Sequence, residues 1–203
     1  MNRKWTGDTL VIATHNAGKL REIRNLLEPY GINIASAGTL GLAEPVETED
    51  SFIGNALLKA KAACQASGFP ALADDSGICI DALAGAPGVY TADWAETSVG
   101  RDFNIAMSKT WVLLEQANAA YPRHAQFRCT LALVWPDGHQ QVYEGMVAGQ
   151  VVWPPRGVMG HGFDPIFLPN GHGRTFAEME EKDKNRVSHR ANAFSQMIKD
   201  CFT

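Results

Sequence analysis

The chain alternates short apolar runs with segments in which apolar residues have helical spacing. The run from Thr9 to Thr14 predicts a buried strand, and a polar turn follows it. Apolar residues then recur three and four positions apart from Leu20 to Tyr30, which predicts an amphipathic helix that ends near Gly31. Ile32 to Ala35 predicts a second strand. This strand–helix–strand order favours an α/β fold.

The same alternation continues along the chain. An acidic loop spans Glu44 to Asp50, and Ser51 is placed to cap a second helix that ends near Gly68. Pro70 to Asp74 predicts a strand, and Ile78 to Ala82 predicts another short strand after it. Helices and strands thus keep following one another, as an α/β fold requires.

The second half of the chain adds a long pair of strands. Helices are predicted from Arg101 to Asn118 and from Ser188 to Phe202. Ala125 to Trp135 and Gln140 to Val152 are rich in β-branched and aromatic residues and flank a Pro-Asp-Gly turn, which predicts a β-hairpin. No linker, repeat or low-complexity tract divides the sequence, so we expect a single domain over residues 1–203 with a mixed sheet.

Composition narrows the class of protein. The 203 residues are 45% hydrophobic and 20% charged, which is typical of a globular domain with a continuous core. The net charge of −4 argues against an extended nucleic-acid surface, so a small-molecule partner is expected. No leader peptide or membrane span is recognised, so we expect a cytoplasmic protein. The four cysteines are scattered without metal or disulfide spacing and are expected to be reduced: Cys64, Cys79, Cys129 and Cys201.

Asp74 and Asp75 form the first candidate site, at the end of a predicted strand. Adjacent carboxylates repel each other, and a turn does not require both. Mg²⁺ between these acids and a phosphate substrate would offset that repulsion, because Mg²⁺ takes carboxylate and phosphate oxygens. The pair therefore indicates a metal site. The alternative is an exposed turn that closes the strand, with Gly77 at a positive φ.

Residues 14–19 form a candidate phosphate loop: Thr14, His15, Asn16, Ala17, Gly18 and Lys19. A strand feeds a helix here, and the free N–H groups and dipole of a helix N-terminus attract phosphate. The sequence contains no Walker motif, which disfavours a P-loop nucleotidase. The alternative is that Asn16 only caps the helix, while Lys19 and Glu22 form a surface pair.

Three other segments carry candidate binding residues. Asn55 and Lys59 share one helix face, where Lys59 could meet the same phosphates or simply be solvated. The glycine-rich stretch around His161 and Phe163 could wall a base pocket or form a turn. The charged run from Lys182 to Arg190 is expected to be solvated, although Arg190 at its end could donate to a carbonyl or phosphate.

Six motifs occur in the order seen in the inosine triphosphate pyrophosphatase family, also called the dITP/XTP pyrophosphatases, and the resemblance covers nearly the whole chain. They are Thr14-x-Asn16-x-x-Lys19-x-x-Glu22, Ser51-Phe52-x-x-Asn55-Ala56-x-x-Lys59-Ala60, Ala73-Asp74-Asp75-Ser76-Gly77, Gly85-Ala86-Pro87-Gly88-Val89-Tyr90, Asp164-Pro165-Ile166-Phe167, and Lys184 followed by Ser188-His189-Arg190. The chain is therefore identified as resembling this family.

The resemblance implies a fold and an activity. The fold would be a mixed, elongated central sheet flanked by helices, with two lobes and an active-site cleft between them. The activity would be Mg²⁺-dependent hydrolysis of ITP, dITP and XTP to the monophosphate and pyrophosphate, which removes miscoding purines from the nucleotide pool. Members of this family are commonly homodimers, and Trp111, Trp135 and Trp153 could supply an interface or lie in the core.

The resemblance also implies residue roles. Residues 14–19 resemble the triphosphate loop, and Lys59 resembles a second phosphate-binding cation. Asp75 resembles the metal-binding acid that accepts a proton from the attacking water, and Glu47 resembles a second metal ligand, with help from Asp74 left open. Substrate contacts are implied for Ser76 and, on the nucleobase side, for His161, Gly162, Phe163, Asp164, Lys184, His189 and Arg190.

Two departures from the family pattern alter these expectations. His161 stands where the family commonly has phenylalanine, so an imidazole would stack on the base. Asp93 stands where the family often has arginine, which removes a cation. Two rival functions also remain: a related pyrophosphatase for modified pyrimidine triphosphates, and a nucleotide sensor without turnover, which the combination of Asp74, Asp75, Lys19 and Lys59 disfavours.

Overall fold

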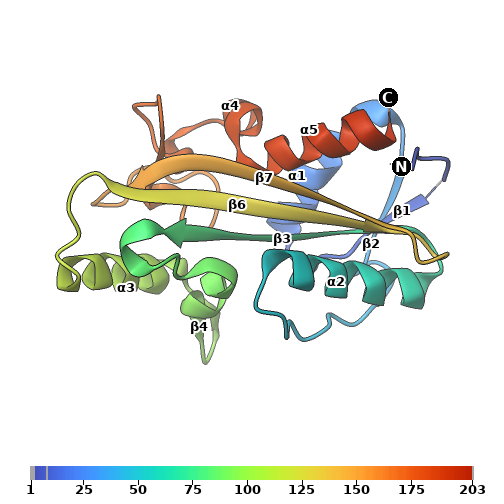
Figure 1. Cartoon of the computed structure of the whole chain (residues 1–203), viewed down its shortest axis with the longest axis horizontal. Helices are drawn as coiled ribbons and strands as arrows, with labels where there is room; N and C mark the ends of the chain where they lie inside the picture. The colour runs from blue at the N-terminus through green and yellow to red at the C-terminus, as the bar shows by residue number, and fades with distance from the viewer. Residues whose placement is uncertain (1–2, 8, 203) are drawn as a thin grey trace. The chain divides into compact units, whose positions relative to one another are not determined.

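The computed structural model describes residues 3–7 and 9–202, and within them six strands form one sheet in the order β2-β1-β3-β6-β7-β8 (Figure 1). β1 pairs in parallel with both β2 and β3, whereas β8 pairs antiparallel with β7. The predicted mixed α/β fold is therefore confirmed. The six strands are β1 (Thr9–Ile12), β2 (Asn33–Ser36), β3 (Ala71–Ile80), β6 (Arg123–Val134), β7 (Gln140–Val151) and β8 (Phe167–Pro169).

The chain divides into two compact units that each draw on several segments. Unit 1 comprises Met1–Asp75, Cys129–Gly145 and Ala191–Thr203, and unit 2 comprises Ser76–Arg128 and Met146–Arg190. The long strands β3, β6 and β7 contribute residues to both units. The single domain over residues 1–203 and the cleft between two lobes stay predictions.

Unit 1 places helices on both faces of its strands (Figure 1). Leu72 packs with residues of α1 and α5 on one face, and Ala71 and Ala73 pack with α2 on the other. Alternate residues of a strand point to opposite faces, so β3 serves both cores. The helices are α1 (Ala17–Leu27), α2 (Phe52–Ser67) and α5 (His189–Cys201), and a 3₁₀ turn, η1 (Glu28–Tyr30), follows α1.

Local signals set the ends of these helices as predicted. Ser51 accepts a hydrogen bond from the Gly54 N–H at the start of α2, and Gly68 ends this helix with φ of 72°. Gly31 ends the turn after α1 with φ of 65°. The turn that joins β6 to β7 has Gly138 at φ of 86°, in the predicted hairpin.

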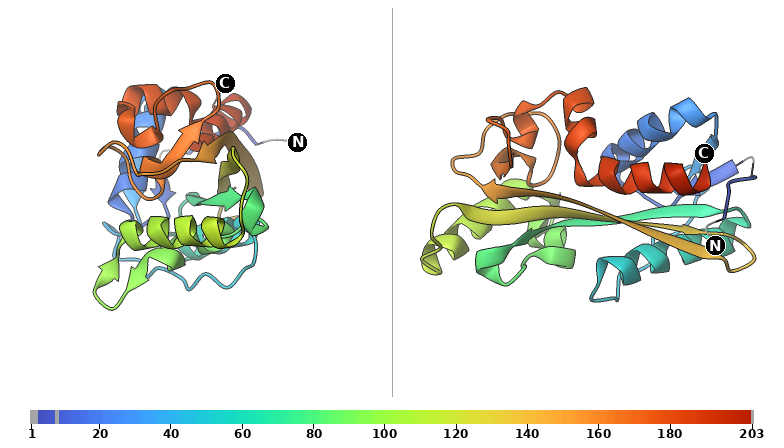
Figure 2. Two further views of the ribbon diagram at one scale, coloured as in Figure 1. Left: turned by 90° about the vertical axis from the view of Figure 1, so that its left-hand side faces the viewer. Right: turned by 45° about the horizontal axis from the view of Figure 1, so that its top comes forward.

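Unit 2 packs α3 (Phe103–Gln116) against its strand segments (Figure 2). The core consists of residues from α3, the strands and the segment around Phe163, with Phe127, Phe167 and Phe176 in mutual ring contact. The remaining elements are η2 (Asp81–Leu83), η3 (Gly88–Thr91), η4 (Asp93–Ala95), β4 (Glu96–Thr97), β5 (Gly100–Arg101), η5 (Asp164–Ile166), η6 (Phe176–Glu178) and α4 (Glu181–Val187).

Three local predictions are wrong. β3 runs without a break from Ala71 to Ile80, so the separate strand predicted from Ile78 to Ala82 does not form. Gly77 is an ordinary strand residue and not part of a turn with positive φ. The charged run also contains a short helix, α4, that the sequence analysis took for a solvated segment.

None of the helices described over residues 3–7 and 9–202 is long and apolar enough to cross a bilayer. Trp135 is buried in the unit 1 core, whereas Trp153 is partly exposed and stacks on Trp111 in unit 2. Part of the polar N-terminal segment, at Met1, Asn2 and Asp8, lies outside the described residues.

Candidate functional site

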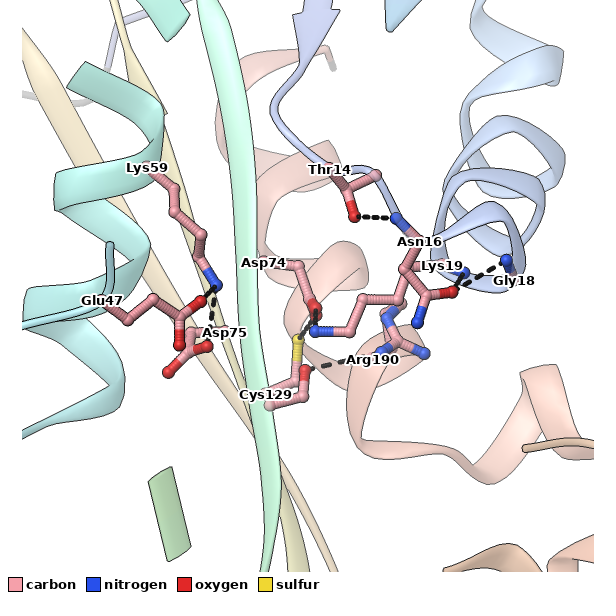
Figure 3. A network of polar contacts seen from close by, with 11 residues as sticks. Thr14, Asn16, Gly18, Lys19, Glu47, Lys59, Asp74, Asp75, Cys129 and Arg190 are labelled. Carbon is pink, nitrogen blue, oxygen red and sulfur yellow. Dashed lines mark hydrogen bonds and ion pairs between the residues drawn. The ribbon is translucent and has the colours of Figure 1, made fainter. Parts of the chain in front are cut away.

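Asp74 and Asp75 point to opposite faces of β3 and join different polar networks (Figure 3). Both residues are buried, and because they lie inside a strand their side chains alternate across the sheet. The two carboxylates therefore do not converge on one point, and the metal site expected between this pair and a phosphate substrate stays a prediction. Asp75 faces α2, and Asp74 faces α1.

Asp75 belongs to a three-residue charge cluster. The Lys59 ammonium donates to Asp75 Oδ1 at 2.8 Å and to Glu47 Oε1 at 2.6 Å. Asp75 and Lys59 are only 5% and 6% exposed, whereas the Glu47 side chain is 39% exposed. The alternative in which Lys59 is solvated is wrong. The cluster brings together three residues that are separated in sequence but predicted to share one site.

Burial and ion pairing together shift the pKa values of Asp75 and Lys59. Burial raises the pKa of Asp75 above its usual value, and the attraction of Lys59 and Lys19 offsets this effect only in part. Burial by itself would lower the pKa of Lys59, but the charges of Asp75 and Glu47 outweigh it and raise that pKa. The ammonium therefore stays charged, and the Asp75 carboxylate is a stronger base than an exposed aspartate.

The loop that carries Glu47 is fastened to α2. The side-chain amide of Asn55 donates to the Glu49 carbonyl and accepts from the Glu49 N–H, each at 3.1 Å. Gly54 permits this contact, since a Cβ there would lie 2.6 Å from the Glu49 Cβ. Asn55 thus positions the acidic loop, a role that the sequence analysis did not assign to it.

Asp74 forms the second network, on the α1 face. Its Oδ1 pairs with the Lys19 ammonium, and its Oδ2 accepts a hydrogen bond from the Cys129 thiol at 3.0 Å (Figure 3). Lys19 therefore pairs with Asp74, whereas the surface-pair alternative had placed it with Glu22. The loss of the Asp74 charge would leave the Lys19 ammonium half-buried without its carboxylate.

The predicted phosphate loop lies at the N-terminus of α1. Asn16 Oδ1 accepts from the N–H groups of Gly18 at 2.9 Å and Lys19 at 3.1 Å, and the Asn16 N–H donates to Thr14 Oγ1. Asn16 thus caps the helix, as the alternative predicted. The side chains at His15, Asn16 and Ala17 are exposed, and Gly18 and Thr14 are half-buried. The loop is therefore accessible to a ligand.

Unit 2 contains a second buried ion pair. The Lys184 ammonium donates to Asp164 Oδ2 at 2.6 Å, and the His161 N–H donates to the same oxygen at 2.8 Å. Lys184 is 4% exposed, so its expected solvation is wrong. A Cβ at Gly160 would lie 2.1 Å from Asp164 Oδ2, so glycine is required for this contact. The imidazole of His161 is exposed.

The remaining residues predicted on the nucleobase side differ in accessibility. The Phe163 ring is 1% exposed in the unit 2 core, edge-on to Phe103, so it does not form the open wall expected of it. His189 is buried and stacks on Phe127 with ring centroids 4.9 Å apart. Buried Arg190 donates to Ser76 Oγ at 3.5 Å. Gly162 is half-buried, and Asp93 begins η4.

Comparison with known proteins identifies the family. The sequence model of the Ham1 family matches residues 10–200. The chain belongs to the Ham1 family. The recognition made from the six motifs is thereby confirmed.

Several known proteins match the chain over almost its full length. The dITP/XTP pyrophosphatase of Ruegeria pomeroyi is 58% identical over 202 residues, covering 100% of this chain and 99% of the relative. The dITP/XTP pyrophosphatase of Rhodospirillum centenum is 52% identical over 200 residues, covering 98% of both chains. Among solved structures, a HAM1 protein from Coxiella burnetii has a TM-score of 0.86 at 35% identity, covering 94% of this chain and 96% of that chain.

The charge cluster of Asp75, Lys59 and Glu47 has features that suit a hard cation. Asp75 Oδ2 is buried and has no hydrogen-bond partner among the described residues, so one carboxylate oxygen is left with an unused lone pair. Glu47 supplies a second carboxylate, which is partly exposed and contacts the same Lys59 ammonium. No group of three or more His, Cys, Asp and Glu converges among the residues described. Mg²⁺ usually takes one or two carboxylates plus phosphates, and Asp75 and Glu47 offer two carboxylates.

Sequence analysis missed two contributors to this Ham1 site. Cys129 was expected only as a reduced thiol, and the structure shows that it also contacts the Asp74 carboxylate. Asn55 was expected on a helix face, without its hydrogen bonds to the acidic loop. No local signal marks Cys129, because its contact depends on β6 lying beside β3. Asn55 is part of the motif that begins at Ser51, so the sequence marked the residue itself. The motif does not show that the Glu49 backbone is its hydrogen-bond partner.

Proposed function

We propose that this protein hydrolyses dITP, XTP and ITP to the nucleoside monophosphate and pyrophosphate, and so removes these nucleotides from the pool. Support comes from the Ham1 relatives named dITP/XTP pyrophosphatases and from the buried Asp75–Lys59 pair. The observation that carries the proposal is the buried Asp75 Oδ2 without a hydrogen-bond partner in the described chain. A carboxylate oxygen of this kind is available to a cation or to a proton of the attacking water.

We further propose Mg²⁺ as the cofactor, held by Asp75 and Glu47 together with substrate phosphates. The carboxylate oxygens of these two residues match the ligands that Mg²⁺ prefers. When bound, the ion would neutralise phosphate charge and lower the pKa of a coordinated water. Asp74 is left out of this ligand set, because its carboxylate lies on the other face of β3.

The chain's own groups would then perform three tasks at the phosphates. The N-terminus of α1 and Lys19 would bind the anionic triphosphate, since both present positive charge. Lys59 would stabilise the pyrophosphate as it departs. Asp75, whose pKa is raised by burial, would accept the proton of the attacking water. This division of roles requires attack at the α-phosphorus, which separates monophosphate from pyrophosphate.

Base selection is proposed to depend on Lys184, His189, Arg190 and the backbone of residues 161–164. Hypoxanthine and xanthine carry a 6-keto oxygen that accepts hydrogen bonds, whereas adenine has an amine there. A site whose donors need that oxygen rejects an analogue lacking it by about 10⁴ or more. Arg190 is the best candidate, because its guanidinium has several donors.

Cytoplasmic location and homodimer formation are also proposed, on family resemblance.

The decisive experiment measures pyrophosphate release from ITP, dITP, XTP, GTP, ATP and dTTP, with Mg²⁺ and with EDTA. Rapid release from the first three nucleotides, abolished by EDTA and restored by excess Mg²⁺, is expected. Preference for a pyrimidine triphosphate would replace this substrate assignment with that of the related pyrophosphatases. No release above background from any nucleotide would overturn the enzymatic function in favour of a sensor.

A further inference from the structure

The Asp74 carboxylate is an anion with no exposed surface. Its side chain is 0% exposed, and it contacts the Lys19 ammonium through Oδ1 and the Cys129 thiol through Oδ2. A buried carboxylate is stable only if its charge is paired and its oxygens are hydrogen-bonded. Lys19 and Cys129 meet these two needs from α1 and β6, respectively.

The position of Lys19 explains why Asp74 is needed. Lys19 is the third residue of α1, and the first turn of this helix contains no acidic residue. A cation at the N-terminus of a helix is opposed by the helix dipole. The Asp74 carboxylate compensates for this, so the ammonium can remain at the positive end of the helix dipole, which favours the same anionic ligand. The orientation of Asp74 therefore determines where the Lys19 charge lies.

We propose that Cys129 is a positioning residue for the phosphate-binding lysine. The thiol donates to Asp74 Oδ2 and fixes the rotation of the carboxylate, which leaves Oδ1 directed at Lys19. Cys129 acts through Asp74 and does not touch the phosphates. The inference rests on the proposed function, because it assumes that Lys19 binds the triphosphate and the pyrophosphate product.

The packing around Cys129 makes this role testable. Cys129 is 1% exposed and belongs to the core cluster that also contains Leu10, Leu72 and Leu131. Serine keeps a donor at this position with little change in volume, whereas alanine and valine remove the donor. Loss of the donor leaves a buried carboxylate oxygen with one hydrogen bond fewer, which weakens the hold on Lys19.

The experiment measures the affinity of the full-length protein for inorganic pyrophosphate with Mg²⁺, by titration calorimetry. Cys129→Ala is expected to weaken binding by about fivefold to tenfold, whereas Cys129→Ser stays within about twofold of the wild type. Cys129→Val replaces the alanine variant if thermal melting shows that the latter is unfolded. Cys64→Ala is the matched control, since it removes another buried thiol of unit 1, and it should leave affinity unchanged.

A double-mutant cycle separates positioning from a general packing defect. In a Lys19→Met background, Cys129→Ala should cause no further loss of pyrophosphate affinity, because the group that it positions is gone. An equal loss in both backgrounds would overturn the proposal, as would unchanged affinity of Cys129→Ala. Failure of the wild type to bind pyrophosphate would overturn the phosphate role of Lys19 and this proposal together, and so would be distinguished from failure of the proposal alone.

Discussion

Asp74 and Asp75 are adjacent in sequence, yet each carboxylate pairs with a different lysine on a different face of β3. Asp75 contacts Lys59 of α2, and Asp74 contacts Lys19 of α1. A pair that the sequence suggested as one site thus belongs to two separate ion pairs. The two aspartates should therefore respond differently to the same substitution.

Asp75→Asn should reduce kcat by about 10²–10⁴, because it removes the proposed proton acceptor while keeping the size of the side chain. Asp74→Asn should mainly raise KM, because it weakens the position of Lys19. Steady-state pyrophosphate release from dITP measures both effects, with thermal melting as the check on folding. A folded Asp75→Asn protein with near-normal turnover would disprove the catalytic role of Asp75.

Lys184→Met should lower the free energy of unfolding by about 3–5 kcal/mol, because it leaves the Asp164 carboxylate buried without its cation. Urea denaturation measures this loss. Lys182→Met is the control, since Lys182 is exposed on the same helix. The double variant Asp164→Asn, Lys184→Met should recover part of the loss. Equal stability of the two lysine variants would contradict a structural role for the ion pair.

Arg190→Lys should narrow the ratio of ITP to ATP turnover, because lysine keeps the charge but loses the planar fork of donors. The ratio of kcat/KM values for the two nucleotides measures this selectivity. Arg186→Lys is the matched control, since its side chain is 68% exposed on α4, and its ratio should equal that of the wild type. An unchanged ratio in Arg190→Lys would count against base recognition by this residue.

Glu178 should contribute stability that disappears in acid. The Thr175 N–H donates to its carboxylate and, with Arg156 nearby, holds the pKa below its usual value of 4.5. Because the folded state favours the charged form, the contribution is present above that usual value and is lost as the pH falls through the lowered folded pKa.

Melting temperatures between pH 7 and pH 3 test this contribution. The wild type should lose more stability across the acid range than Glu178→Gln, which lacks the titrating group. Glu180→Gln removes a nearby exposed carboxylate and should follow the wild-type profile. Identical profiles for wild type and Glu178→Gln would show that this hydrogen bond adds no stability.

Features set by neighbouring residues were predictable from sequence. Ser51 and Gly68 mark the ends of α2 through their own side chain and backbone freedom, and the turn at Gly138 specifies the hairpin. The family resemblance also brought Lys59, Asp75 and Glu47 into one predicted site, and in the structure the Lys59 ammonium contacts both carboxylates. Mg²⁺ binding and the residue roles stay predictions.

Features set by distant partners were not predictable. Gly77 suggested a turn, but β3 continues through it beside β6. Lys184 lies in a charged run that looks solvated, and only the position of Asp164 shows why it is buried. Phe163 suggested an exposed aromatic wall, yet its ring completes the unit 2 core. In each case a tertiary contact outweighs the local pattern.

The double hydrogen bond between Asn55 and the Glu49 backbone affects how a ligand can be received. A free loop of this length would have to give up its conformational freedom when a nucleotide arrives, which weakens affinity. Here part of that freedom is already lost when the protein folds, because the side-chain amide of Asn55 in α2 makes two hydrogen bonds to the loop backbone at Glu49. The loop bearing Glu47 is consequently held to α2 without a ligand, so under the proposed function little ordering of this loop would have to accompany phosphate binding.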